Sequence, residues 1–254
     1  MDKIYYESAD NKLCGILTES LNKEQIVIMC HGIRGNKDEC NSFVYLAEEL
    51  KKCGYSSFRF DFNGHGESSG NDYDMTITKE IKDIQNTIIM LKSKGYKEFI
   101  LLGGSFGASI VSLLPYQNYN CIKGLVFWYG AINYDYIKYG NLFTKENKQI
   151  AEKNKFYISK SINTGENFKF GMDLFNEVNK FKPYEELKKC NLPKLFVHGD
   201  IDSAIPYKVS KEVSELCNNS EFKLIKNGEH TFANSKEALN NAIDVTIAFI
   251  RQYL

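Results

Sequence analysis

The sequence predicts a single α/β domain over residues 1–254, built on a mostly parallel, doubly wound β-sheet. Short apolar runs alternate with amphipathic segments from residue 25 onward, which is typical of parallel strands joined by right-handed helical crossovers. The chain has 254 residues, of which 43% are hydrophobic, enough for one large core. One apolar run ends in Gly-x-Ser-x-Gly and leads into a helix, a strand–turn–helix pattern that suits such a sheet.

The N-terminal part predicts a hairpin followed by the first crossover. Residues 3–8 and 12–19 are short alternating segments separated by a polar turn, which indicates two antiparallel strands. Residues 25–30 form a compact apolar strand. A glycine-containing loop over 31–36 leads to a helix over 42–53, whose apolar residues recur at helical spacing.

The next two parallel strands follow in the same manner. An aromatic-rich strand over 56–62 runs into a long polar turn, and a helix over 78–94 carries its isoleucines on one face. The apolar run over 99–102 is the strand that enters the serine turn. Residues 108–114 form the following helix, which a proline ends.

The C-terminal half completes the sheet after an insertion. Residues 124–129 predict a buried strand. From about residue 132 to 187, tyrosine, phenylalanine, lysine and asparagine dominate and no strong strand interrupts them, so we expect an inserted cap (residues 132–187) that is mostly helical and loop. Strands over 195–198 and 222–226 and an amphipathic helix over 241–254 close the core.

Ser105, at the centre of the Gly-x-Ser-x-Gly pattern, is the candidate nucleophile. A serine hydroxyl reacts only when a base removes its proton and the backbone holds it exposed. A tight turn would supply the exposure, with strained backbone geometry at the serine. Side chains at Gly103 and Gly107 would clash where strand and helix pass. The same pattern occurs in ordinary glycine-rich turns, so the assignment of Ser105 as a nucleophile depends on finding a base and an acid elsewhere in the chain.

Two later loops, both leaving carboxyl ends of expected strands, supply an acid and a histidine. The strand over 195–198 leads to Asp200 and Asp202, and the last strand leads to His230. The order serine, aspartate, histidine along the chain is that of a Ser-His-Asp triad on an α/β sheet. Asp135, which follows the preceding strand, is the alternative acid.

These segments resemble the α/β-hydrolase superfamily over nearly the whole chain. Within it, they are most similar to bacterial cinnamoyl (feruloyl) esterases and their monoacylglycerol-lipase-like relatives of the serine aminopeptidase S33 type. The residues that carry the resemblance are His31-Gly32, the segment from Asp61 to Ser68, the serine turn, the segment from His198 to Asp202, and Gly228-Glu229-His230.

The resemblance implies roles for particular residues. It implies that Asp202 is the triad acid and Asp200 a structural turn residue. It also implies that the backbone N–H groups of Ile33 and Phe106 form the oxyanion hole, where each donor is worth about 3 kcal/mol of transition-state stabilisation. This chain has Gly-Gly-Ser-Phe-Gly where Gly-His-Ser-Gln-Gly is typical, so a substrate contact made by the usual glutamine has no counterpart here.

The remaining histidines and the aromatic residues of the cap have simpler interpretations. His31 and His198 each precede a glycine at a strand end, so we expect buried rings bonded to the backbone, and we expect His65 to be structural in its glycine turn. Tyr134 and Asp135 are candidate contacts to a phenolic hydroxyl. Several aromatic residues could line an acyl pocket, but we favour the interpretation that they pack the cap onto the core. These residues are Tyr129, Tyr134, Tyr136, Tyr139 and Phe143.

The expected activity is hydrolysis of small to medium carboxylic esters, including hydroxycinnamoyl (feruloyl) esters, through a covalent acyl-enzyme. The same triad would also serve a monoacylglycerol lipase, a thioesterase or an aminopeptidase. A non-catalytic binding protein with the hydrolase fold is the alternative from a different class. No metal or organic cofactor is expected.

Composition bounds the partners and the location. Lys plus Arg and Asp plus Glu both number 32, so a nucleic-acid partner is not expected. The first residues lack a basic region followed by an apolar segment, and no run approaches the about 18 apolar residues of a membrane span, so we expect a soluble protein that is not exported. Seven scattered cysteines indicate reduced thiols in the cytoplasm rather than disulfides or a zinc site. The expected partner is a small-molecule ester, and both a monomer and a homodimer remain open.

Overall fold

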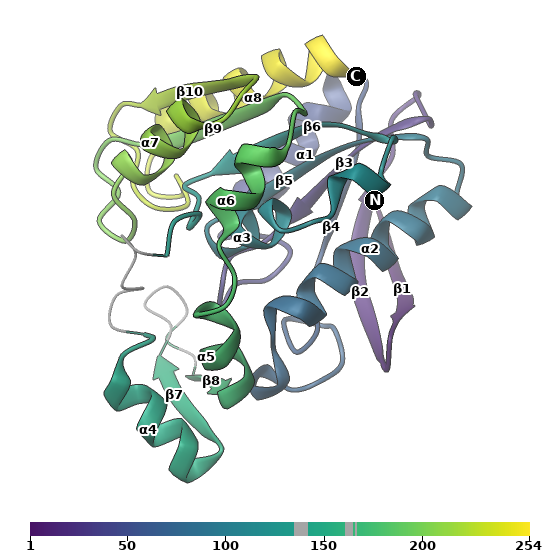
Figure 1. Cartoon of the computed structure of the whole chain (residues 1–254). Helices are drawn as coiled ribbons and strands as arrows, with labels where there is room; N and C mark the ends of the chain where they lie inside the picture. Colours follow the sequence, from purple (N-terminus) through teal and green to yellow (C-terminus); the bar gives the residue numbers. More distant parts are fainter. Residues whose placement is uncertain (135–141, 161–164, 166) are drawn as a thin grey trace.

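The central sheet has eight strands in the order β1-β2-β4-β3-β5-β6-β9-β10 (Figure 1). The computed structural model describes residues 1–134, 142–160, 165 and 167–254. Strand β2 is antiparallel to β1 and to β4, and the other neighbouring strands of this sheet are parallel. The predicted mostly parallel, doubly wound α/β fold is therefore confirmed.

The elements follow the predicted order closely. The strands of the sheet are β1 (Asp2–Ser8), β2 (Asn11–Thr18), β3 (Gln25–Cys30), β4 (Ser56–Phe60), β5 (Glu98–Gly104), β6 (Ile122–Trp128), β9 (Lys194–Gly199) and β10 (Ser220–Ile225). The helices of the core are α1 (Ser42–Lys52), α2 (Ile77–Ser93), α3 (Phe106–Ser112), α7 (Lys208–Leu216) and α8 (Lys236–Tyr253), with short 3-10 helices η1 (Asp72–Asp74) and η2 (Tyr116–Asn118).

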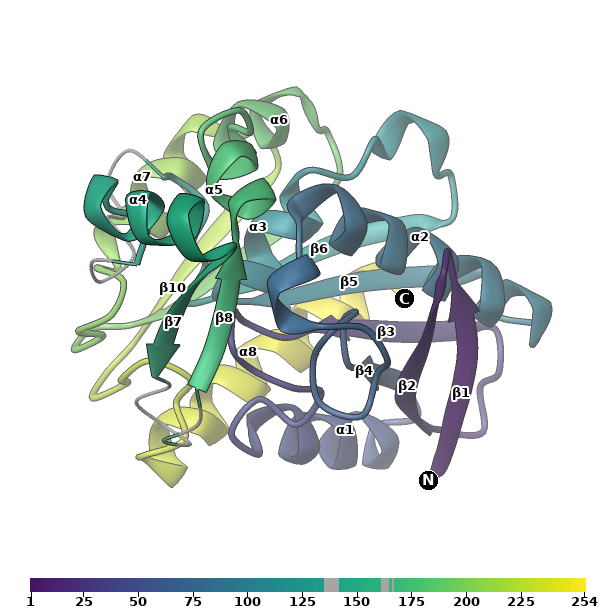
Figure 2. The ribbon, with the colours of Figure 1, turned by 90° about the horizontal axis from the view of Figure 1, so that it is seen from below.

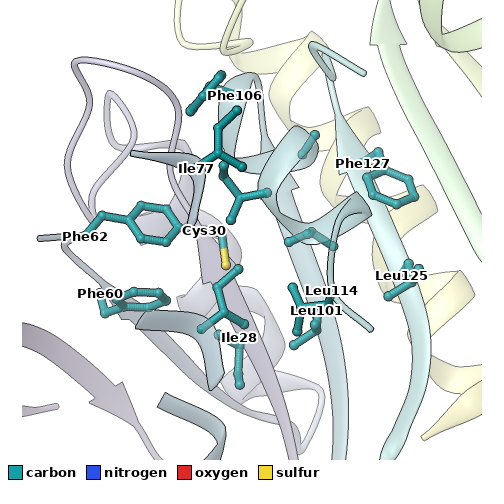
Figure 3. Close-up of a cluster of buried hydrophobic side chains, with 14 of the residues drawn as sticks. Ile28, Cys30, Phe60, Phe62, Ile77, Leu101, Phe106, Leu114, Leu125 and Phe127 are labelled. Atoms are coloured by element: carbon teal, nitrogen blue, oxygen red, sulfur yellow. The ribbon is translucent and has the colours of Figure 1, made fainter. Parts of the chain in front are cut away.

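Helices cover both faces of the sheet, because successive side chains of each central strand point to opposite faces. In β5, Phe99 and Leu101 belong to the cluster that packs against α2 and α3, whereas Ile100 and Leu102 belong to the cluster that packs against α1 and α8. Figure 2 shows α1 and α2 on opposite sides of the sheet. Figure 3 shows the first cluster, with Leu101 among side chains from neighbouring strands and helices.

The segment between β6 and β9 contains α4 (Lys145–Asn154), β7 (Phe156–Lys160), β8 (Asn167–Gly171), α5 (Met172–Val178) and α6 (Pro183–Lys189). We call its described residues within 132–187 the cap. Beside its helices and loops, the cap contains a hairpin that the sequence pattern does not predict, in which β7 and β8 pair antiparallel. Phe168 and Phe170 recur every second residue in β8, a strand signal that the surrounding lysines and asparagines obscure.

Helix α7 is absent from the sequence prediction. Its buried apolar residues are Val209 and Val213, four residues apart, and polar residues stand between and beside them in the sequence. The apolar face is therefore too short to give a clear helical pattern. Among the described residues, no helix combines the length and apolar character needed to cross a membrane.

Candidate active site

The candidate residues lie at the carboxyl ends of the parallel strands. Ser105 follows β5, Asp202 lies in the loop after β9, and His230 lies in the loop after β10. Because these strands run parallel within one sheet, their loops leave the same edge. The fold thus brings together three side chains that are far apart in the sequence.

Ser105 occupies a strained turn between β5 and α3. Its backbone angles, φ 51° and ψ −117°, lie outside the regions that residues with side chains usually adopt. A Cβ atom at Gly103 would lie 2.6 Å from the Cα of Ala108, and one at Gly107 would lie 2.2 Å from the carbonyl oxygen of Cys30. Glycine at both positions is therefore a steric requirement, as the sequence predicts.

Hydrogen bonds link Ser105, His230 and Asp202. The Nε2 atom of His230 lies 3.2 Å from Ser105 Oγ, and its Nδ1 atom lies 2.8 Å from Asp202 Oδ2. Because an ionised carboxylate only accepts, Nδ1 carries the ring proton and Nε2 is left to accept the proton of Ser105. This is the geometry that activation of a serine by a general base requires.

The side chain of Asp202 is buried and makes four hydrogen bonds. Its Oδ1 accepts from the backbone N–H groups of Ala204 and Ile205, each at 2.9 Å. Its Oδ2 accepts from His230 and, at 3.1 Å, from Nε2 of His198. Burial alone would raise the pKa of Asp202, but the hydrogen bonds from the two histidines outweigh it and hold the pKa below its usual range. The carboxylate is therefore charged and fixed in position.

His198 is a partner of Asp202 that sequence reasoning missed. Its Nε2 atom faces two acceptors, Asp202 Oδ2 and the carbonyl oxygen of Ile205 at 2.9 Å, so this nitrogen carries the ring proton. Its Nδ1 atom then accepts from the hydroxyl of Ser210 at 2.8 Å. From the sequence we expect the His198 ring to bond to the backbone, and of its three contacts only the one with Ile205 is of this kind. The spacing of four residues between His198 and Asp202 across a turn was the available signal.

Asp200 lies in the same loop as Asp202 but has a different role. Asp200 begins the loop that holds Asp202, and its backbone N–H donates to the carbonyl oxygen of Ile225 at 3.0 Å. This contact fits the turn role expected of Asp200. The carboxylate that binds His230 is that of Asp202, and Asp135 lies outside the described residues.

A buried ion pair fixes the loop after β3, which carries Ile33. Asp61 accepts from the backbone N–H of Lys37 at 2.6 Å and from its Nζ at 2.7 Å, and Lys37 Nζ also lies 2.8 Å from Glu67 Oε1. Burial would lower the pKa of Lys37, but the two carboxylates raise it above its usual range. Phe106, the other candidate oxyanion donor, begins α3 directly after Ser105.

Cys14, Asp61 and Glu67 form a group of possible metal ligands among the described residues. The ammonium group of Lys37 already binds both carboxylates of this group. A cationic side chain thus occupies the place where a metal ion would need to bind, so this group fits an internal ion pair better than a metal centre.

His31 and His65 support the loops beside the triad. His31 Nδ1 donates to the carbonyl oxygen of Gly32 at 2.8 Å, and its Nε2 accepts from the backbone N–H of Phe62 at 3.1 Å. His65 Nδ1 bonds the carbonyl oxygen of Asn63 at 3.0 Å. Burial lowers the pKa of His31 to about 4 and that of His65 to about 3, so both rings are neutral near pH 7. These contacts match the structural roles expected of both rings.

The aromatic residues of the cap and its border are packed. Tyr134 is half-buried against the cluster that joins the core to the cap, and Phe143 packs edge-on against Phe175 with ring centroids 5.3 Å apart. The buried ring of Tyr129 lies 4.8 Å from that of His230. Outside the described residues lie Asp135, Tyr136 and Tyr139. The described ones therefore follow the packing interpretation favoured from the sequence.

A polar cavity of about 360 Å³ lies between the loop after β3, the glycine turn after β4 and the cap. Arg34, His65 and Phe168 are among its lining residues. The guanidinium group of Arg34 reaches across to the cap, where its Nη1 donates to Ser159 Oγ at 2.9 Å and to the carbonyl oxygen of Lys160 at 3.2 Å. The cap is thus tied to the loop that also carries Ile33.

Comparison with known proteins gives a family and several relatives. The family model described as serine aminopeptidase, S33, matches residues 22–182. Mouse mitochondrial palmitoyl-protein thioesterase ABHD10 is 23% identical over 189 residues, a match that covers 74% of this chain and 63% of that protein. The chain thus spans slightly less than two thirds of the length of this relative.

Solved structures resemble the whole chain. Est1E from Butyrivibrio proteoclasticus with ferulic acid bound has a TM-score of 0.80 and 22% identity, covering 98% of both chains. The mouse alpha/beta hydrolase domain-containing protein 10 also has a TM-score of 0.80, with 20% identity and 99% of both chains covered. At these identities the likeness establishes the fold.

Proposed function

The chain belongs to the serine aminopeptidase S33 family of α/β-hydrolases, and from that premise we propose that it is a serine carboxylesterase with Ser105 as nucleophile, His230 as base and Asp202 as acid. The hydrogen-bonded chain from Ser105 Oγ through the His230 ring to Asp202 Oδ2 is the observation that carries the proposal. A hydrolase that holds this constellation on a strained serine turn is equipped for acyl transfer.

In the proposed reaction, His230 Nε2 takes the proton of Ser105 as Oγ attacks the ester carbonyl. The backbone N–H groups of Ile33 and Phe106 donate to the oxyanion that forms. His230 then protonates the leaving alkoxide, which departs as the alcohol and leaves an acyl-serine. Water then attacks the acyl-serine while His230 takes its proton. His230 returns a proton to Ser105 Oγ as the bond to the acyl group breaks and the carboxylic acid is released.

The proposed substrates are small to medium carboxylic esters, among them hydroxycinnamoyl (feruloyl) esters. Similarity to a structure that holds ferulic acid supports this choice. Tyr134 and Asp135 remain the proposed contacts to a phenolic hydroxyl. Thioester hydrolysis is the second candidate, because one relative is named a palmitoyl-protein thioesterase. The same triad can serve it, since an acyl-serine forms from an ester or from a thioester.

The experiment is a comparison of initial rates on methyl ferulate, p-nitrophenyl butyrate, palmitoyl-coenzyme A, a monoacylglycerol and an aminoacyl anilide, for the wild type and Ser105→Ala. We expect turnover of the esters, best with methyl ferulate, and none by the variant. Faster turnover of the thioester would favour the second candidate. Labelling of Ser105 by a fluorophosphonate without turnover of any substrate would retain the triad and overturn the substrate class. Absence of labelling would favour a binding protein.

A further inference from the structure

Glu39 is a buried carboxyl group in the loop between β3 and α1 that the proposed triad leaves without a role. The residue is only 4% exposed, and among the described residues it makes no ion pair with a lysine or arginine. A carboxyl group buried without a cation costs stability. The backbone is also left-handed at Glu39, Cys40 and Asn41 in succession, with φ of 43°, 53° and 69°. Such a path is unfavourable for residues with side chains.

The carboxyl group of Glu39 binds the loop that carries the candidate oxyanion donor. Its Oε2 accepts from the backbone N–H of Gly32 at 3.0 Å, one residue before Ile33. Its Oε1 lies 3.4 Å from the hydroxyl of Tyr129, whose ring packs against that of His230. One side chain therefore contacts supports of both the oxyanion loop and the base.

The same carboxyl group lies directly behind the nucleophile. A Cβ atom at Gly32 would be 2.9 Å from Ser105 Cβ and 3.1 Å from Glu39 Oε1. A Cβ atom at Gly104, the residue before Ser105, would be 3.0 Å from Glu39 Oε1 and 3.1 Å from the Tyr129 hydroxyl. The absence of side chains at Gly32, in the loop after β3, and at Gly104, next to the serine, thus leaves room for this acid and for the tyrosine.

We propose that Glu39 is a positioning residue for acyl transfer: it holds the N–H of Ile33 in register with Ser105, and its negative charge favours the protonated form of His230 during attack. This inference rests on the proposed function, because it assumes that Ser105, His230 and Ile33 act as proposed. The first role needs only an acceptor for Gly32, whereas the second needs the charge.

The charge of Glu39 changes within the range in which the enzyme would be assayed. Burial raises the pKa of Glu39 to about 7, against the opposing effects of the Gly32 N–H, His230 and Tyr129. The titratable side chains around the carboxyl are Tyr129 after β6, His230 after β10 and His31 after β3. Burial raises the pKa of Tyr129 far above neutrality and lowers that of His31 to about 4, so neither changes charge near pH 7.

The test compares Glu39→Ala, Glu39→Gln and the control Glu80→Gln. Glu80 is an equally buried carboxyl, 2% exposed, on α2 and outside the proposed machinery. For each protein, kcat and KM on p-nitrophenyl butyrate are measured between about pH 5.5 and pH 8.5. The rate of Ser105 labelling by a fluorophosphonate is measured alongside.

We expect Glu39→Ala to lower kcat about 10-fold to 100-fold with little change in KM, because the oxyanion loop loses its anchor. Glu39→Gln keeps an acceptor for Gly32, so its kcat should approach that of the wild type near pH 6. It should fall about 10-fold behind above pH 7, where only the wild type carries the charge. Glu80→Gln should match the wild type within about twofold at every pH.

Two results would overturn the proposal. One is a kcat of Glu39→Ala within twofold of the wild type, and the other is a ratio of wild type to Glu39→Gln that does not change with pH. A failure of the proposed function itself looks different, because Ser105 of the wild type would then react with no fluorophosphonate and no ester.

Discussion

At the scale of the residue, the triad proposal predicts graded losses of activity. Ser105→Ala and His230→Ala should each lower kcat by several orders of magnitude, and Asp202→Asn by about ten-thousand-fold, because the amide favours the wrong tautomer of His230. Thermal unfolding should show folded variants. If Asp202→Asn remains active while Asp135→Asn is inactive, the acid is Asp135 and the assignment made here is wrong.

His198 offers a second prediction at this scale, because it donates to the same carboxylate oxygen as His230. His198→Gln retains an N–H donor that can reach Asp202, whereas His198→Leu leaves Oδ2 with one donor fewer in a buried place. We expect the leucine variant to lose about 10-fold in kcat and the glutamine variant to lose much less. Steady-state kinetics with melting curves distinguish this from general destabilisation, and equal losses in both variants would contradict it.

The sequence predicted the three residues that the structure brings together, for a simple reason. Ser105, Asp202 and His230 each follow an apolar strand, and parallel strands bring their carboxyl ends to one edge. Glu39 lies in the loop after β3 and His198 lies near the end of β9, but which neighbours these two side chains face depends on turns that only the folded chain defines. A buried glutamate inside a polar loop looks like a solvated one in the sequence.

At the scale of the element, β3 passes close to the start of α3, so we expect replacement of a glycine there to cost more stability than replacement of a glycine elsewhere. In Gly107→Ala the new methyl group would meet backbone atoms of Cys30 and His31, which cannot move aside. We expect a loss of more than about 4 kcal/mol in unfolding free energy, or no soluble protein.

Gly95→Ala is the matched control for this substitution. Gly95 has φ +101° and no atom within 4 Å of its would-be Cβ, so only backbone strain opposes the change. We expect a loss of about 1–2 kcal/mol. Urea unfolding of both variants measures the difference. Equal stability losses at the two sites would show that backbone contact is not what requires glycine at position 107.

Elements with continuous apolar runs were predictable, and those with mixed surfaces were not. Strand β3 spans Gln25–Cys30 as expected, because all its residues but the first are buried and both faces are apolar. In contrast, β7 and β8 are only partly buried and each contains a lysine, and α7 buries few residues along one stripe. Their conformation depends on what they pack against, which the local pattern does not reveal.

At the scale of the whole molecule, two hydrophobic clusters on opposite faces hold the sheet rigid while one edge carries the site. The loops after β3, β5, β9 and β10 all reach that edge, and the cap joins it through Arg34. Rigid strands therefore position the polar side chains, and the loops bear the strain and the buried charge. The strain and the buried charge at the site should therefore lower the unfolding free energy of the molecule.

Glu39 makes this loss of stability measurable through pH. Its pKa rises from 4.5 to about 7 on folding, so between these values the folded state binds more protons than the unfolded state. Stability contributed by this group therefore falls as pH rises through that window, by about 3 kcal/mol in total, and stays low above pH 7. Glu39→Gln does not titrate, so its unfolding free energy relative to the wild type should increase from about pH 4.5 to about pH 7 and then level off.

Urea unfolding of both proteins in reducing buffer at several pH values measures this difference. A variant that is more stable above pH 7 yet slower in the ester assay would show that the buried charge serves catalysis at the expense of stability. A pH-independent difference would mean that folding does not raise the pKa of Glu39, and a difference that keeps increasing above pH 7 would mean that the carboxyl is still uncharged there in the folded protein.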